Sequence, residues 1–207
     1  YQNIVVQGYD FSVGSQSAVA FFPLYPLLVK ILSFNGAINP IVVATCINYL
    51  ATVGICIGAL NVAVKLHKKI SSAHKLLIVL GILAFPTAFF FTSFYVDALL
   101  VFLILTSIYF ALEHKFVAAF IVAGLASGTK FTGIVAVLVS LAVYFSFVKV
   151  SNRNIAKGFG FGVIGISGLL LYMLFLQVKF GDAFAFFTAQ NAWGRNDGIF
   201  IFELIRQ

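Results

Sequence analysis

Long apolar runs alternate with short polar stretches along this sequence. Five apolar runs occupy residues 40–64, 76–112, 116–127, 131–148 and 158–178. Asp97 is the only Asp, Glu, Lys or Arg inside any of them. A helix that crosses the ~30 Å hydrocarbon core of a bilayer needs about 20 mostly apolar residues. The pattern therefore predicts an all-α polytopic bundle of transmembrane helices.

The run 76–112 is too long for one crossing. As a single helix, its 37 residues would extend ~55 Å at ~1.5 Å per residue, so two helices joined by a turn are expected. The polar residues Thr92, Ser93, Tyr95 and Asp97 indicate where the turn lies. A carboxylate at the bilayer centre costs ~2.5–3.5 kcal/mol or more, which favours a position for Asp97 at the membrane surface.

Dividing this run gives about six spans. The run 116–127 is short, and a tilted or partly re-entrant helix would accommodate it. Pro86 lies in the outer half of the first helix of the divided run, where a proline is expected to kink it.

The segments that flank the spans have a different character. Residues 21–34 are too short for a span and contain Pro23, Pro26 and Lys30, which predicts an interfacial helix. Residues 179–207 are too polar to cross and rich in aromatic side chains, as an interfacial segment would be. We expect one membrane domain over residues 1–207, with an outer loop and interfacial helix (1–39), transmembrane helices (40–178) and an outer interfacial segment (179–207).

Composition supports a membrane protein and excludes an ordinary soluble domain. The chain is 62% hydrophobic and 9% charged, with a mean hydropathy of +1.08. Soluble domains are about 45–50% apolar and about 25% charged. The chain begins with Tyr1, and no basic segment typical of a signal peptide precedes an apolar one. We therefore expect a piece of a longer protein.

The positive charge collects in alternate connections. The segments 65–75, 113–115 and 149–157 carry one acid, Glu113, and eight cations: Lys65, Lys68, Lys69, Lys75, Lys115, Lys149, Arg153 and Lys157. Loops rich in Lys and Arg face the cytoplasm. This set is therefore predicted to be cytoplasmic.

The remaining connections are electrically balanced and are predicted to lie outside. They carry the five cations Lys30, Lys130, Lys179, Arg195 and Arg206 and the five acids Asp10, Asp97, Asp182, Asp197 and Glu203. The net charge of +7 is thus a topology signal, so no nucleic-acid partner is expected. Membrane lipid is the expected surrounding.

Two charged residues at the outer tips admit structural interpretations. Asp97 is expected to act as the N-cap of the returning helix. Lys130 follows the small-residue phrase GLASGT, and it either extends its amine to the interface or binds a phosphate. These sequence features leave both roles open for Lys130.

Other motifs favour packing over chemistry. The G-x-G-x-x-G match at Gly160, Gly162 and Gly165 lacks the preceding strand that a dinucleotide site requires. The glycines of this stretch are better explained as a close-packing helix face, as are Gly54 and Gly58. The three histidines have no paired ligand spacing, so they do not indicate a metal site.

Three phrases together resemble a known family. GYD before FFPLYPLL, then FPTAFFFTSFYVDALL, and then AGLASGTKFTGI are similar to the GT-C class of membrane glycosyltransferases, most closely the GPI mannosyltransferase II family and its prokaryotic relatives. The resemblance covers residues 1–134, and residues 187–195 support it more weakly.

The sequence also departs from that family. The family's Trp-Asp pair, which carries the main base, would lie before Tyr1. Asp97 stands where the family commonly has Glu, and Lys130 where it commonly has Arg. Both changes keep the charge, but Lys lacks the bidentate fork that Arg offers to phosphate.

The resemblance implies transfer of a sugar, mannose in the nearest members, from a polyprenyl-phosphate donor on the outer or luminal face. No bound cofactor is expected, and the sequence leaves the use of a divalent metal open. Asp97 and Asp10 are expected as secondary carboxylates. The expected substrate-binding residues are Lys130, Arg195, Tyr9, Tyr95, Gln190 and Trp193. A polytopic transporter or lipid flippase is the alternative from another functional class.

Overall fold

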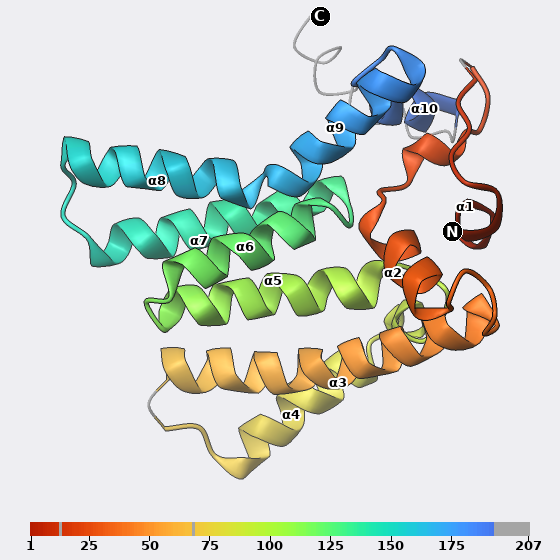
Figure 1. The fold of residues 1–207 in the computed structure, drawn as a ribbon. Helices are drawn as coiled ribbons and strands as arrows, with labels where there is room; N and C mark the ends of the chain where they lie inside the picture. The colour runs from red at the N-terminus through yellow and green to blue at the C-terminus, as the bar shows by residue number, and fades with distance from the viewer. Residues whose placement is uncertain (13, 68, 193–207) are drawn as a thin grey trace, which may run out of the picture.

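The computed structural model describes residues 1–12, 14–67 and 69–192, and over these residues the chain is helical with no strand (Figure 1). Its α-helices are α1 (Gln2–Gln7), α2 (Leu24–Leu32), α3 (Pro40–Leu66), α4 (Ser72–Leu83), α5 (Asp97–Leu112), α6 (Phe116–Ser127), α7 (Ile134–Phe147), α8 (Asn152–Gly165), α9 (Ser167–Phe180) and α10 (Ala185–Ala192). Three short 3-10 helices are η1 (Ala18–Ala20), η2 (Ala88–Phe91) and η3 (Phe131–Gly133). The all-α prediction is confirmed.

The centre of the fold is a bundle in which α3, α5, α6, α7 and α8 lie roughly side by side (Figure 1). α6 packs against α5, α7, α8 and α9. Its buried face carries small residues, Ala119, Ala123 and Ala126, which allow neighbouring helices to approach closely.

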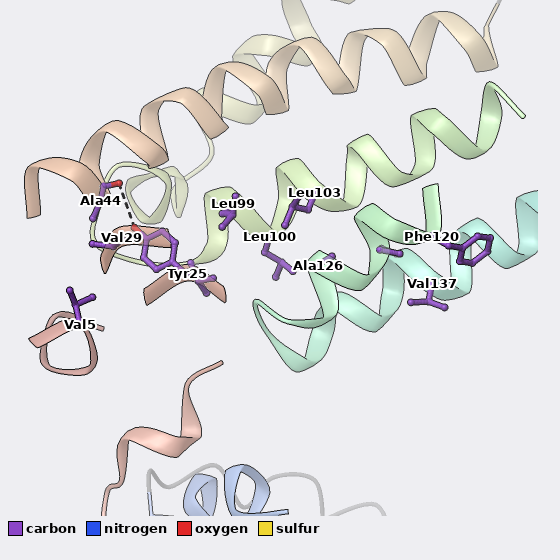
Figure 2. Close-up of a cluster of buried hydrophobic side chains, with 13 residues drawn as sticks. Val5, Tyr25, Val29, Ala44, Leu99, Leu100, Leu103, Phe120, Ala126 and Val137 are labelled. Atoms are coloured by element: carbon purple, nitrogen blue, oxygen red, sulfur yellow. Dashed lines mark hydrogen bonds between the residues drawn. The ribbon is translucent and has the colours of Figure 1, made fainter. Parts of the chain in front are cut away.

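One buried cluster connects the bundle to the N-terminal segment. Leu99, Leu100 and Leu103 of α5 contribute to it together with Phe120 of α6, and Tyr25 of α2 lies at its other side (Figure 2). Burial of these side chains stabilises the position of α2 against the ends of α3 and α5, because each buried aliphatic or aromatic side chain contributes about 1.5–3 kcal/mol.

The connections separate into two groups at opposite ends of the bundle (Figure 1). The connections 67–71, 113–115 and 148–151 lie at one end, which we call the basic end. Here Lys65 forms an ion pair with Glu113, and this bond holds the pKa of the Glu113 carboxyl below its usual value. The opposite end carries α2, η2 and the connection 128–133. Among the described residues, the fold therefore gathers each predicted charge set at its own end.

The hairpin predicted within residues 76–112 is present, and its first helix is shorter than expected. α4 ends at Leu83, and a connection that includes η2 leads to Asp97, where α5 begins. The predicted kink at Pro86 is wrong, because the helix has already ended. A proline disfavours helical dihedral angles in the residue before it, so termination is the simpler outcome.

The span expected over residues 158–178 is not one continuous helix in the structure. α8 and α9 are separated at Ile166 and bent by 52°. At this bend α9 crosses α6 so closely that a Cβ added to Gly168 would lie against the Gly124 carbonyl oxygen. The Ser127 hydroxyl accepts a hydrogen bond from the Leu169 amide (3.3 Å), which satisfies a donor in the first turn of α9.

Helix length separates α3 from the other helices. Within the described residues, α3 alone is one unbroken helix long and apolar enough to cross a bilayer, and α8 with α9 qualifies as a second if the bent pair forms one span. The helices α4, α5, α6 and α7 have 12 to 16 residues each. The six-span arrangement therefore stays a prediction, as does the interfacial location of α2.

Candidate functional site

Asp97 and Lys130 meet at the end of the bundle opposite the basic end. The Lys130 Nζ donates a hydrogen bond to the Asp97 Oδ1 at 3.0 Å. The Asp97 side chain is 30% exposed and the Lys130 side chain is 42% exposed. Asp97 is the first residue of α5, and Lys130 lies between α6 and η3, so the fold brings together two tips that the sequence indicated separately.

The predicted N-cap role of Asp97 is wrong. Val96 occupies the cap position of α5, and no side chain caps this helix terminus. The Asp97 carboxylate contacts Lys130 instead. Its place in the first turn still sets a negative charge at the positive end of the helix dipole, which is favourable.

Asp97 and Lys130 line a cavity of about 400 Å³. Four predicted site residues line it: Tyr95, Asp97, Lys130 and Gln190. The other residues that line it are Tyr1, Ala20, Phe21, Phe22, Phe90, Val96, Thr129, Phe131, Thr132, Phe186 and Phe187. A mostly apolar and aromatic wall with a few convergent polar groups is typical of a small-molecule site.

Most of the aromatic wall escaped prediction from the sequence. Phe90, Phe131 and Phe186 belong to η2, η3 and α10, and only the fold brings these elements together. The sequence signal for this wall was the presence of consecutive phenylalanines at 89–91 and 186–187. Phenylalanine is so frequent in this chain, with 25 copies, that such pairs do not identify a site.

The connection that carries Lys130 is held firmly. The Thr129 side chain is fully buried, and its hydroxyl donates to the Ala126 carbonyl (2.6 Å). The Leu24 amide donates to the Gly128 carbonyl (3.0 Å), which fastens the start of α2 to the same connection. The position of Lys130 is therefore fixed by backbone and buried polar contacts.

Asn48 of α3 holds the segment that leads into Asp97. Its side chain is fully buried, and its amide nitrogen donates to the carbonyls of Ser93 and Tyr95, the latter at 3.0 Å. The Tyr25 hydroxyl donates to the Asn48 Oδ1 (3.1 Å). Asn48 is not among the site residues predicted from the sequence, although an amide inside an apolar run is the signal that identifies it.

Tyr9 and Asp10 lie outside the cavity around Asp97. They line a neighbouring cavity of about 460 Å³, and Tyr1 and Phe21 border both. The Asp10 Oδ1 accepts from the Ala18 amide (3.1 Å). This contact joins Asp10 to the first residue of η1.

Tyr9 has a packing role in the same loop. Its hydroxyl donates to the Phe21 carbonyl (2.9 Å), and its ring packs against Tyr172 and Phe175. Burial raises the pKa of the Tyr9 phenol, so the hydroxyl keeps its proton and remains a donor. These contacts stabilise the loop against α9.

Two predicted residues, Trp193 and Arg195, lie outside the described residues. Within the part that the structure describes, no three His, Cys, Asp or Glu side chains come together as a metal site would require. No family model, curated protein or solved structure matches this chain.

Proposed function

We propose that this chain forms part of a polytopic membrane glycosyltransferase of the GT-C class. The transferred sugar is mannose, the donor is a polyprenyl phosphate, and the active face is extracytoplasmic or luminal. The observation that carries the proposal is the cavity at the end of the bundle where Asp97 meets Lys130. The resemblance of residues 1–134 to that class supplies the reaction.

The reaction needs a cation and a carboxylate close together. The bond between the sugar's anomeric carbon and the phosphate oxygen breaks, and a bond to the acceptor oxygen forms. Lys130 binds the departing phosphate, which gains negative charge as this bond breaks. The N-terminal end of α5 lies at the same place and favours an anion.

Asp97 acts as a secondary carboxylate in this scheme. The resemblance assigns the main base, which takes the proton of the acceptor hydroxyl, to a position before Tyr1. Asp97 accepts a hydrogen bond from an acceptor or sugar hydroxyl once phosphate engages Lys130. Tyr95 and Gln190 line the same cavity and supply further polar contacts to the substrates, while Arg195 remains a second candidate for the phosphate.

The distribution of charge supports the orientation of this site. The basic end lies opposite the end that carries α2 and the connection 128–133 (Figure 1), and residues of that connection line the cavity. The positive-inside rule assigns a basic end to the cytoplasm. The cavity is then extracytoplasmic or luminal. A donor with a polyprenyl tail requires a site at the membrane surface, because its tail partitions into the hydrocarbon while its phosphate stays near water.

The decisive test replaces Asp97 with asparagine in the full-length protein. Asp97→Asn keeps the shape of the side chain but removes its charge. We expect normal membrane insertion and a loss of transfer of roughly 10- to 100-fold, since a hydrogen bond to a charged group contributes about 1.5–3 kcal/mol. Asp182→Asn is the matched control, because Asp182 lies in the connection before α10 and lines none of the cavities described here. Full transfer activity in Asp97→Asn would contradict the proposal.

A transporter or lipid flippase is the second candidate, and the bend between α8 and α9 is the observation that favours it. Discontinuous helices surround the substrate sites of many transporters. Those sites also place charges near the bilayer midplane. In the described residues, charged side chains lie in connections or within two turns of a helix end. Lipid translocation by the purified protein in vesicles, without sugar transfer, would select this candidate.

A further inference from the structure

A further cleft lies at the basic end, far from Asp97 and Lys130. This α3–α4 cleft has a volume of about 800 Å³. It is lined by Ala59, Val62, Ala63, Leu66, His67, Lys69, Ile70, His74, Leu77, Ile78 and Leu105. Its walls are therefore aliphatic, and its cationic and histidine side chains come from one short stretch.

The walls of the cleft follow from helical spacing. Ala59, Val62, Ala63 and Leu66 recur at intervals of three and four residues, so they form one stripe along α3. His74, Leu77 and Ile78 form the facing stripe of α4 in the same way. α4 has no buried residue, so the cleft between the two stripes is open, and Leu77 is 65% exposed.

The mouth of the cleft is positively charged. A second cavity of about 530 Å³ on the same rim is lined by Val64, Lys69, Ile70, Ser71, His74 and Lys75. Lys69 and Lys75 are exposed, and no acid occurs between Lys65 and Lys75. α4 also begins here, after Ser71, which adds the positive end of a helix dipole.

We propose that the α3–α4 cleft binds an anionic glycerophospholipid. The acyl chains lie between the stripes of α3 and α4, and Lys69 and Lys75 bind the phosphate at the rim. Charge complementarity selects this occupant, because basic pockets between membrane helices bind anionic head groups and an aliphatic cleft accepts chains. The inference rests on the membrane location proposed above and is independent of sugar transfer.

The test measures lipid adducts on the purified full-length protein by native mass spectrometry. Phosphatidylglycerol and phosphatidylcholine with identical acyl chains are the two probes. We expect the parent protein to prefer phosphatidylglycerol by roughly 30-fold, because each of the two lysines near the head group strengthens binding of the anionic lipid roughly fivefold. The absence of such a preference would overturn the proposal.

Variants locate the site. Lys69→Gln/Lys75→Gln should abolish the preference. Lys149→Gln/Lys157→Gln should keep it, since that pair removes the same charge from the same end but lines neither cavity. An equal loss in both double variants would show general surface attraction and overturn the site.

A further variant tests the aliphatic part of the cleft. Leu77→Trp fills the cleft without disturbing a buried residue, because Leu77 is exposed. It should reduce binding of both lipids while all lysines remain. Unchanged binding in Leu77→Trp would overturn the placement of the chains. Because none of these measurements uses sugar transfer, their failure is distinguishable from failure of the transferase proposal.

Discussion

Buried polar side chains in this molecule act as connectors between elements. Asn48 bonds to α2 through Tyr25 and to the segment before α5 through two carbonyls. Ser107 similarly contacts α6 and α7, where its hydroxyl donates to the Ala119 carbonyl at 2.9 Å and lies 2.8 Å from the Ser140 hydroxyl. A buried polar group without a partner costs about 1–3 kcal/mol, so such residues tolerate few positions of their neighbours.

Asn48→Ala is expected to lower the free energy of unfolding by about 2 kcal/mol, because it leaves the carbonyls of Ser93 and Tyr95 without the Asn48 amide. The Tyr25 hydroxyl then keeps only its longer bond to the Ala44 carbonyl (3.5 Å). Denaturant unfolding of the purified protein in detergent measures this. Asn61→Ala is the control on the same helix; Asn61 is exposed, and its replacement should change stability by less than about 0.5 kcal/mol. Equal effects would contradict the connecting role of Asn48.

Lys130→Met should raise the donor KM by roughly tenfold or more and leave the acceptor KM nearly unchanged, since Met keeps the aliphatic stem but cannot bond to phosphate. Lys130→Arg should retain activity, because its planar fork bonds to phosphate bidentately. Steady-state assays that vary donor and acceptor separately make the distinction. Lys30→Met, an exposed lysine on α2, should affect neither constant. An unchanged donor KM in Lys130→Met would remove Lys130 from the site.

Among the helices, α6 determines how the second half of the bundle is arranged. It matches the apolar run predicted at 116–127 residue for residue, and its small residues accept α9 at close range. The bend between α8 and α9 lies where this contact occurs. Tight packing at Gly124 and Gly168 thus accounts for a break that hydrophobicity alone did not indicate.

Gly124→Ala is expected to lower the unfolding temperature by roughly 3–10 °C, because the new Cβ would lie 2.7 Å from the Ile164 carbonyl oxygen and the Ser167 hydroxyl. Gly160→Ala provides the control on α8, where no atom lies within 4 Å of the added Cβ. The control should keep or raise the unfolding temperature, since Ala favours a helix over Gly by about 1 kcal/mol. A thermal melt of both variants tests this; shifts of the same sign and size would contradict it.

The whole molecule is polarised, with cationic connections at the basic end and the Asp97–Lys130 cavity at the other. The α3–α4 cleft and this cavity therefore contact different membrane surfaces if the bundle crosses the bilayer. The Lys65–Glu113 ion pair joins α3 to the α5–α6 connection at the basic end.

Single cysteines should report this polarity. With Cys46 and Cys56 replaced, a cysteine at Ser71 or Asn154 should be shielded from an impermeant thiol reagent applied outside intact cells. A cysteine at Thr132 should react, because Thr132 is exposed beside the cavity, whereas the neighbouring Thr129 is fully buried. Labelling of Ser71 and Thr132 positions from the same side would contradict the proposed orientation.

The amino-acid sequence was sufficient to predict the helical class, the bounds of α6, the hairpin turn near Asp97 and the separation of charge between alternate connections. These properties depend on local composition and on the length of apolar runs, which a single chain segment carries by itself. The contact between Asp97 and Lys130 depends instead on how α5 and α6 pack, because these residues lie 33 positions apart. The bend at Ile166, the role of Asn48 and the aromatic wall of the cavity likewise arise from contacts between helices, since steric fit and hydrogen-bond satisfaction exist only once the helices are together.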